Sequence, residues 1–156
     1  MSDREIGSLL SGGVDSSLIS ALVNKFNTSE KLKTFSIGMP GSVDLKYAKE
    51  VATFIDSDHH QIETSESTFL QAIETVIYNI ESYDTTTVRA SIGNYLVSKY
   101  IRENSDCKVI FNGDGSDEVC GGYLYMKNAP STLDFQEECE RLVAEIYKFD
   151  VLRSDR

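Results

Sequence analysis

The sequence lacks any apolar run long enough to cross a membrane, which excludes a membrane-spanning helix. Its first residues, MSDREIG, lack the basic and apolar regions of a secretory signal peptide. Cysteine is scarce as well, since the chain has only Cys107, Cys120 and Cys139. Their number is odd and their spacing matches no metal-binding pattern. We therefore expect reduced thiols and a cytoplasmic protein that does not bind membranes.

Histidine is almost as scarce, and the two histidines, His59 and His60, are adjacent at the start of a short predicted strand. Successive side chains of a strand face opposite sides of the sheet. One site could therefore hardly use both rings, and we expect a structural or surface role for them.

Positive charge is in deficit, because 15 lysines and arginines stand against 25 aspartates and glutamates, for a formal net charge of −10. Such an acidic surface repels phosphate backbones and argues against nucleic acid as a partner. A nucleotide could still bind through local backbone N–H groups, basic side chains or a metal. The 156 residues show no internal repeat and no Pro/Gly-rich linker, so we expect one domain with a substantial core.

Short apolar runs alternate with segments of helical periodicity. Strands are expected at residues 6–10, 32–37, 59–63 and 108–111, and helices at 15–26, 44–55, 69–80, 92–103 and 134–152. Apolar residues at positions 18, 19, 22, 23 and 26 are spaced for one face of the first helix. Asp44, and Ser65 or Ser67, are the expected helix caps, and the polar stretch 82–91 is expected to interrupt the helices. The alternation predicts an α/β fold with a parallel sheet covered on both faces.

Two glycine-rich loops that contain acidic residues follow the first and the fourth strand, at residues 11–17 and 113–122. The carboxyl ends of parallel strands form one edge of the sheet, and ligands of such folds bind outside that edge. We therefore expect the two loops to meet at one rim of the molecule.

The first loop, SGGVDSS, leads from a strand into a helix, which offers unpaired N–H groups and a positive dipole end to a phosphate. Gly12 and Gly13 permit a tight turn, and the serines add hydroxyl donors. A carboxylate beside phosphate is repulsive, so Asp15 is expected to bind Mg²⁺ that bridges to phosphate oxygens. The alternative is a plain Gly-Gly turn with Asp15 as a helix cap.

The second loop places Asp114, Asp117 and Glu118 within five residues of one another. Like charges that close are unfavourable unless solvent or a cation relieves them. The alternatives are thus an exposed acidic turn or part of a cation site shared with the first loop. Arg89 is the sole basic residue in the polar stretch before it and suits either a charged role in a site or the surface.

The SGGVDSS run resembles the motif of PP-loop ATP pyrophosphatases, adenine nucleotide alpha hydrolase-like enzymes that cleave ATP to AMP and pyrophosphate. The runs TFSIGMPGSVDLKYAKEVA, HH, IESYDTTTVRAS, NGDGSDEVCGGYLY and YKFDVLRSDR are similar, in order and spacing, to the synthetase domain of glutamine-hydrolysing asparagine synthetases. The resemblance implies a three-layer α/β/α PP-loop domain. It also implies that residues 1–156 are part of an ATP-binding synthetase domain, without the glutaminase domain of a full-length protein.

The resemblance implies an AMP-forming carbon–nitrogen ligase that makes asparagine from aspartate, ATP and ammonia through β-aspartyl-AMP. It is compatible with a homodimer. The rival interpretations are a β-lactam synthetase-like enzyme and a truncated, non-catalytic nucleotide-binding domain. The resemblance also implies roles for individual residues. Pyrophosphate binding is implied for Ser11, Gly12, Gly13, Asp15, Ser16 and Ser17, and metal binding for Asp15 and Asp117. Adenosine contacts are implied for Leu10 and Ile37, a ribose or adenylate contact for Gly113, and contacts with the pyrophosphate or the acyl-adenylate for Thr86, Thr87 and Arg89.

The chain departs from the family pattern at two places. Where the family usually reads S-G-E-G-S-D-E, this chain has Asn112 and Asp114, so the candidate base for the amide-forming step is a carboxylate one methylene shorter. Where the family typically reads RASTPMYL, this chain reads RASIGNYL, and Ile92 and Gly93 are expected to affect substrate recognition.

Overall fold

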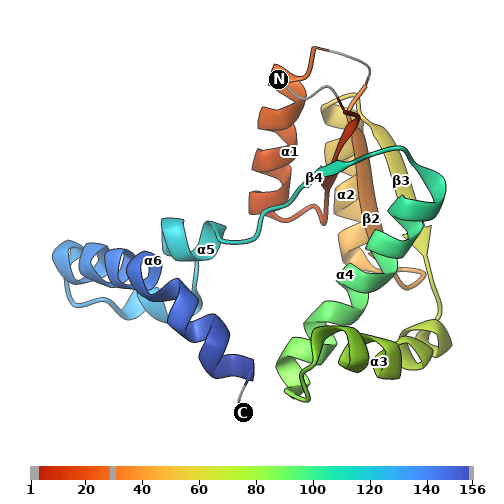
Figure 1. Ribbon diagram of the computed structural model, residues 1–156. Helices are drawn as coiled ribbons and strands as arrows, with labels where there is room; N and C mark the ends of the chain where they lie inside the picture. The colour runs from red at the N-terminus through yellow and green to blue at the C-terminus, as the bar shows by residue number, and fades with distance from the viewer. Residues whose placement is uncertain (1–3, 29–30, 155–156) are drawn as a thin grey trace.

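The computed structural model describes residues 4–28 and 31–154, with side chains described up to residue 146. Its sheet consists of β1 (Ile6–Leu9), β2 (Lys33–Gly38), β3 (Asp58–Glu63) and β4 (Val109–Phe111). All neighbours pair in parallel, in the order β3-β2-β1-β4 (Figure 1). The predicted parallel sheet is confirmed.

Helices cover both faces of this sheet, which confirms the three-layer α/β/α prediction (Figure 1). The helices are α1 (Val14–Phe26) and α2 (Val43–Phe54) on one face, α4 (Thr85–Asn104) on the other, and α3 (Glu66–Ile80) packed on α4. On the α4 face, buried Phe35 packs with Val97 and Ile101. On the opposite face, Leu10 packs with residues of α2. Within the described ranges, no helix is long and apolar enough to cross a membrane.

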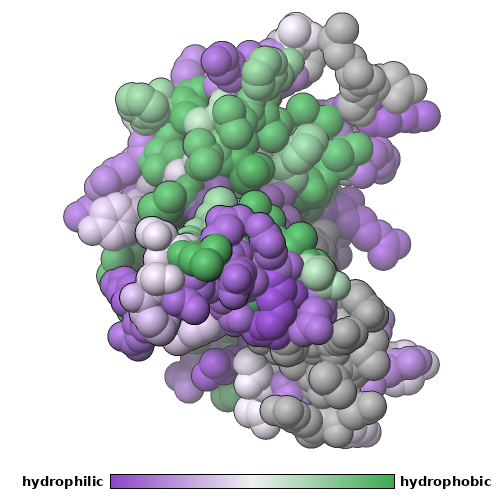
Figure 2. Space-filling view, turned by 90° about the vertical axis from the view of Figure 1, so that its left-hand side faces the viewer, coloured by the Kyte–Doolittle hydropathy of each residue, from purple (hydrophilic) through white to green (hydrophobic). Residues whose placement is uncertain are grey.

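The first helix turns a polar residue inward, contrary to the expected apolar face. Ser20 is fully buried, and its Oγ lies 2.8 Å from Oγ of Ser8 on β1. Leu18, Leu22 and Phe26 are instead exposed, with Phe26 at 71%. The prediction for these three is wrong because a serine pair joins α1 to the sheet and turns them outward. Figure 2 views the molecule from the α1 side and shows a broad hydrophobic area in its upper half.

The polar stretch 82–91 separates α3 from α4 only at residues 82–84, and it is helical from Thr85 on, so the predicted break is wrong for residues 85–91. Helix α4 begins at Thr85 because the Asp84 side chain accepts hydrogen bonds from the N–H of Thr87 at 2.8 Å and from its Oγ1 at 2.9 Å. This cap offsets the modest helix propensity of three successive threonines. Ser42, not Asp44, occupies the N-cap position of α2, without a side-chain cap hydrogen bond, and Asp44 lies in the first turn. Ser65 caps α3, as predicted.

The histidine rings lie on opposite faces of the sheet, as the strand pattern predicts. Both nitrogens of His59 have hydroxyl partners, Thr34 Oγ1 at 2.9 Å and Ser36 Oγ at 3.2 Å. Burial lowers the pKa of His59, which favours the neutral ring between these hydroxyls. His60 stacks on Phe35 and meets Tyr100 edge-on. Both rings therefore have structural roles.

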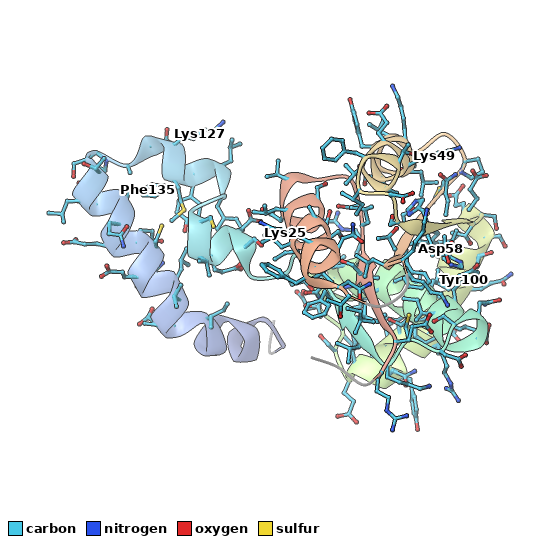
Figure 3. All side chains as sticks on the ribbon, turned by 90° about the horizontal axis from the view of Figure 1, so that it is seen from above. Lys25, Lys49, Asp58, Tyr100, Lys127 and Phe135 are labelled. Carbon is cyan, nitrogen blue, oxygen red and sulfur yellow. The ribbon has the colours of Figure 1, made fainter. Side chains whose placement is uncertain are left out.

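After β4 the chain forms a unit that projects from the sheet (Figures 1 and 3). It contains α5 (Ser116–Cys120), the 3₁₀ helix η1 (Leu124–Asn128) and α6 (Thr132–Ser154), of which only α6 was expected. A small core of Met126, Cys139 and Leu142, with Tyr123 and Phe135 packed against it, holds the unit together. We call it the α5–α6 unit.

Helix α4 contains a glycine without an evident structural need. A side chain at Gly93 would meet nothing within 4 Å, and its φ is not in the left-handed region. Gly93→Ala should therefore stabilise the protein by about 0.5–1 kcal/mol, because alanine loses less backbone entropy in a helix. Thermal unfolding should show a rise of about 1–4 °C. A lower unfolding temperature would show that position 93 has a packing role.

Candidate functional site

A cleft of about 1020 Å³ opens at the carboxyl end of the sheet. It is bounded by the end of β1 and the start of α1, by the end of α3 and the start of α4, and by the loop after β4. Its lining residues are Leu9, Ser11, Gly13, Asp15, Ser16, Ile80, Ser82, Thr86, Thr87, Ala90, Ser91, Asn94, Asn112, Gly113, Asp114, Gly115, Asp117, Glu118 and Tyr123.

Nine of the fourteen residues that the sequence analysis gives a pyrophosphate, adenosine, adenylate, metal or base role share this lining: Ser11, Gly13, Asp15, Ser16, Thr86, Thr87, Gly113, Asp114 and Asp117. The structure thus brings together three segments of the chain, the first and last of which are 106 positions apart from Ser11 to Asp117. Both acidic loops belong to it, together with the threonines that open α4.

The other five lie outside the lining. Leu10 is 1% exposed and belongs to the core with Ala48 and Ala52, so Leu9 faces the cleft in its place. Ile37 packs against the core cluster around Phe35. Gly12 lies against α2, Ser17 Oγ is buried without a hydrogen-bond partner in the described part of the chain, and Arg89 is exposed on α4.

Serine hydroxyls hold the first loop in a closed turn. Ser16 Oγ accepts a hydrogen bond from the N–H of Ser11 at 3.2 Å and lies 2.9 Å from Ser11 Oγ. The same Ser16 hydroxyl donates to the carbonyl of Gly13 at 3.2 Å. Gly12 takes φ +83° in this turn, which favours glycine. Ser11, Gly13 and Ser16 all line the cleft, so this turn and the N-terminal end of α1 lie at its wall.

Asp15 is not the N-cap of α1. Gly13 occupies that position, and α1 has no side-chain cap hydrogen bond. Asp15 lies in the first turn and lines the cleft. Asp15 therefore belongs to the cleft wall and does not close the helix end.

The two acidic loops touch each other at Gly113. A side-chain carbon at this position would lie 2.9 Å from the nitrogen of Ser16 and 3.1 Å from the carbonyl carbon and Cβ of Asp15. These are contacts closer than a methyl group tolerates, and two of the three are with backbone atoms. Because residue 113 is glycine, the second loop rests directly on the first turn of α1.

Side-chain hydrogen bonds organise the second loop. The Asn112 amide nitrogen donates to Oδ2 of Asp114 at 2.9 Å, and the Asp114 N–H donates to Oδ1 of Asn112 at 3.3 Å. This reciprocal pair orients the Asp114 carboxylate in the cleft. The Tyr123 hydroxyl donates to Oε1 of Glu118, which links α5 to the segment before η1 within the α5–α6 unit. Asp117, the third carboxylate of this loop, also lines the cleft.

The cleft is strongly acidic. Asp15, Asp114, Asp117 and Glu118 contribute four carboxylates, and the lining contains no lysine, arginine or histidine among the described residues. Nor do these residues form a cluster of three or more acidic, histidine or cysteine side chains able to hold a metal by themselves. Mg²⁺ is commonly held by one or two carboxylates together with substrate phosphates and water. Asp15 and Asp117 fit that pattern of binding.

Sequence reasoning assigned Thr86 and Thr87 to the site but missed the rest of their wall, which is the polar face of α4. Thr87, Ser91 and Asn94 follow each other at helical spacing and all line the cleft, together with Ala90. The spacing was present in the sequence, but the expected break at 82–91 obscured it. Ile92 is buried between α3 and α4, and neither it nor Gly93 lines the cleft. Of the residues in RASIGNYL that depart from the family pattern, Asn94 is the one that faces the ligand space.

Comparison with known proteins agrees with this site. A family model described as asparagine synthase matches residues 1–154. The whole chain is 53% identical over 160 positions to asparagine synthetase [glutamine-hydrolyzing] from Gallus gallus, 52% to that from Mus musculus and 51% to that from Homo sapiens. In each case it spans 28% of the relative's length.

Solved structures share the fold at low sequence identity. NMN synthetase from Francisella tularensis superposes with a TM-score of 0.51 at 17% identity, over 78% of this chain and 50% of that one. A protein described as a predicted subunit of a tRNA methyltransferase from Methanocaldococcus jannaschii gives a TM-score of 0.50 at 14% identity, over 88% of this chain and 74% of that one. The α/β fold expected from the sequence is confirmed.

Proposed function

The chain belongs to the asparagine synthase family, and we propose that its cleft binds ATP and activates the side-chain carboxylate of aspartate as β-aspartyl-AMP. The contact of Gly113 with Asp15 and Ser16 carries this proposal, because it joins a phosphate-type loop to an acidic loop in one cleft. Its volume, about 1020 Å³, is ample for a nucleotide together with a small amino acid.

In this proposal the first loop binds the pyrophosphate part of ATP. Ser11, Gly13 and Ser16 line the cleft and supply hydroxyl and N–H donors. Gly12 and Ser17 support the turn from behind. Leu10 and Ile37 belong to core clusters on opposite faces of the sheet and lie outside the lining of the cleft. Hydrogen-bond donors aimed at a departing pyrophosphate stabilise the charge that develops on it.

Asp15 and Asp117 would hold Mg²⁺, which supplies charge neutralisation for the triphosphate. Four carboxylates without a lining cation make this the simplest way for a polyanion to enter the cleft. Further basic groups would come from segments outside this chain, which spans 28% of its relatives' length.

The second half of the proposed reaction is amide formation. Ammonia attacks the acyl carbon of β-aspartyl-AMP, a C–N bond forms, and AMP leaves with the electrons of the broken C–O bond. Asp114, oriented by Asn112, would accept the proton that the attacking amine loses. Thr86 and Thr87 face the same space and would contact the acyl-adenylate, with Arg89 at the rim.

The remaining parts of the proposal concern partners and location. We expect the ammonia to come from a glutaminase domain in the full-length protein, as the names of the relatives suggest. Three free cysteines support a reducing cytoplasmic location. A homodimer is compatible with the family resemblance.

The decisive experiment is a pyrophosphate-release assay with ATP, Mg²⁺ and aspartate, with and without ammonium. We expect release that depends on aspartate, and asparagine in the mass spectrum only when ammonium is added. ATP binding without release would identify a non-catalytic nucleotide-binding domain. Release with no asparagine would show that the adenylate forms and the amide step is lost. No ATP binding at all would refute the proposal.

A further inference from the structure

The geometry points to Gly122 as a positioning residue for the Asp117 carboxylate, an inference that rests on the proposed metal and nucleotide site. Gly122 is not in that site's lining. A side-chain carbon at Gly122 would overlap Oδ1 of Asp117 and lie 3.1 Å from its Cγ and 3.3 Å from its Cα. The carboxylate that faces the cleft thus occupies the place where residue 122 would otherwise carry a side chain.

The backbone gives no other reason for glycine at this position. Residues 12, 41, 115 and 121 are the described glycines with positive φ, and Gly122 is not among them. Alanine could therefore adopt the backbone conformation of residue 122 without strain. What excludes alanine there is the carboxylate of Asp117.

The backbone cannot move aside to make room, because the residues on both sides are anchored. A side-chain carbon at Gly121 would already overlap the Phe135 ring and lie 3.1 Å from Cys139 Sγ, so Gly121 is packed tightly on α6. Tyr123 on the other side packs into the core of the α5–α6 unit and donates to Glu118. Figure 3 shows Phe135 within this unit, which is set apart from the sheet. The Gly122 N–H also donates to the Asp117 carbonyl at 3.0 Å.

The side chain of Asp117 is consequently the part that must give way. Its carboxylate ends a short rotatable side chain, so a methyl group at residue 122 would rotate it to another position at little cost to the fold. Gly122→Ala should then displace the Asp117 carboxylate from its position and leave the charge of Asp117 unchanged. The α5–α6 unit would thereby set the position of the metal ligand.

The test compares wild type, Gly122→Ala, Asp117→Ala and the double variant, with Gly93→Ala as a matched change outside the cleft. We expect Gly122→Ala to shift the ¹³Cγ NMR resonance of Asp117 and to leave the unfolding temperature within about 2 °C. Its ATP dissociation constant should rise about tenfold in Mg²⁺ and stay unchanged in EDTA. The double variant should bind ATP no more weakly than Asp117→Ala, because both changes remove one interaction.

An unmoved Asp117 resonance in Gly122→Ala would overturn the inference, and so would an additive loss in the double variant. Failure of the wild type to bind ATP in a Mg²⁺-dependent way would instead refute the proposed function. In that case the resonance shift would still decide whether residue 122 positions the carboxylate.

Discussion

Asp15→Ala should lose Mg²⁺-dependent ATP binding and keep its fold. Removing one partner of a desolvated charge interaction typically costs about 2–5 kcal/mol, which corresponds to a rise in the ATP dissociation constant on the order of 30- to 4000-fold. The fold should persist because α1 has no side-chain cap hydrogen bond and Gly13, not Asp15, is its N-cap. Isothermal titration of ATP with Mg²⁺ and with EDTA measures the effect.

The stability of this variant separates the two interpretations of Asp15. A first-turn carboxylate interacts with the helix dipole, so its loss should lower the free energy of unfolding by no more than about 1 kcal/mol. Asp15→Asn is the matched control, since it keeps the shape of the side chain and removes the charge. Both variants should lose the Mg²⁺-dependent part of the affinity. Unfolding of Asp15→Ala with ATP affinity preserved would show that the residue serves the helix and not the ligand.

The fold was predictable because its determinants are local. Short apolar runs and helical periodicity identify β1, α1, β2 and α2 to within one or two residues. Parallel topology then follows from the alternation, and with it the edge where both loops lie. The meeting of the loops was thus deducible from chain order alone, before any contact was known.

The inward face of α1 could not be predicted because a long-range hydrogen bond sets it. Leucines and a phenylalanine normally mark the buried side of a helix. Here Ser20 is the buried residue, paired with Ser8, a residue twelve positions earlier on β1. The outward residues Leu18, Leu22 and Phe26 leave an apolar surface whose orientation no local pattern reveals.

The start of α4, and with it this wall of the cleft, was predicted wrongly for a different reason. Helix propensity and helix capping favour opposite outcomes at residues 85–87. Three threonines in a row disfavour a helix, while Asp84 stabilises its first turn through Thr87. Propensity alone could not tell which effect prevails. Once the helix starts at Thr85, the cleft-facing positions Ser91 and Asn94 follow from helical spacing. The residues of α4 that face the cleft can be predicted from the sequence only once the first residue of the helix is known.

Gly113→Ala should separate the two loops and weaken ATP binding without removing any ligand. Its added methyl group would lie 2.9 Å from the Ser16 nitrogen and 3.1 Å from two Asp15 atoms, and φ at Gly113 is not in the left-handed region. Overpacking of this kind typically costs about 1–3 kcal/mol, so the unfolding temperature should fall by about 2–12 °C.

ATP affinity in Mg²⁺ should fall together with stability in this variant, on the order of tenfold or more, because a metal held between Asp15 and Asp117 needs both loops in register. Gly93→Ala, the same change where nothing lies within 4 Å, should keep full affinity. Titration of both variants, with thermal unfolding in parallel, makes the comparison. A destabilised Gly113→Ala that still binds ATP as wild type does would mean that loop contact serves the fold alone, and the nucleotide site would have to lie elsewhere.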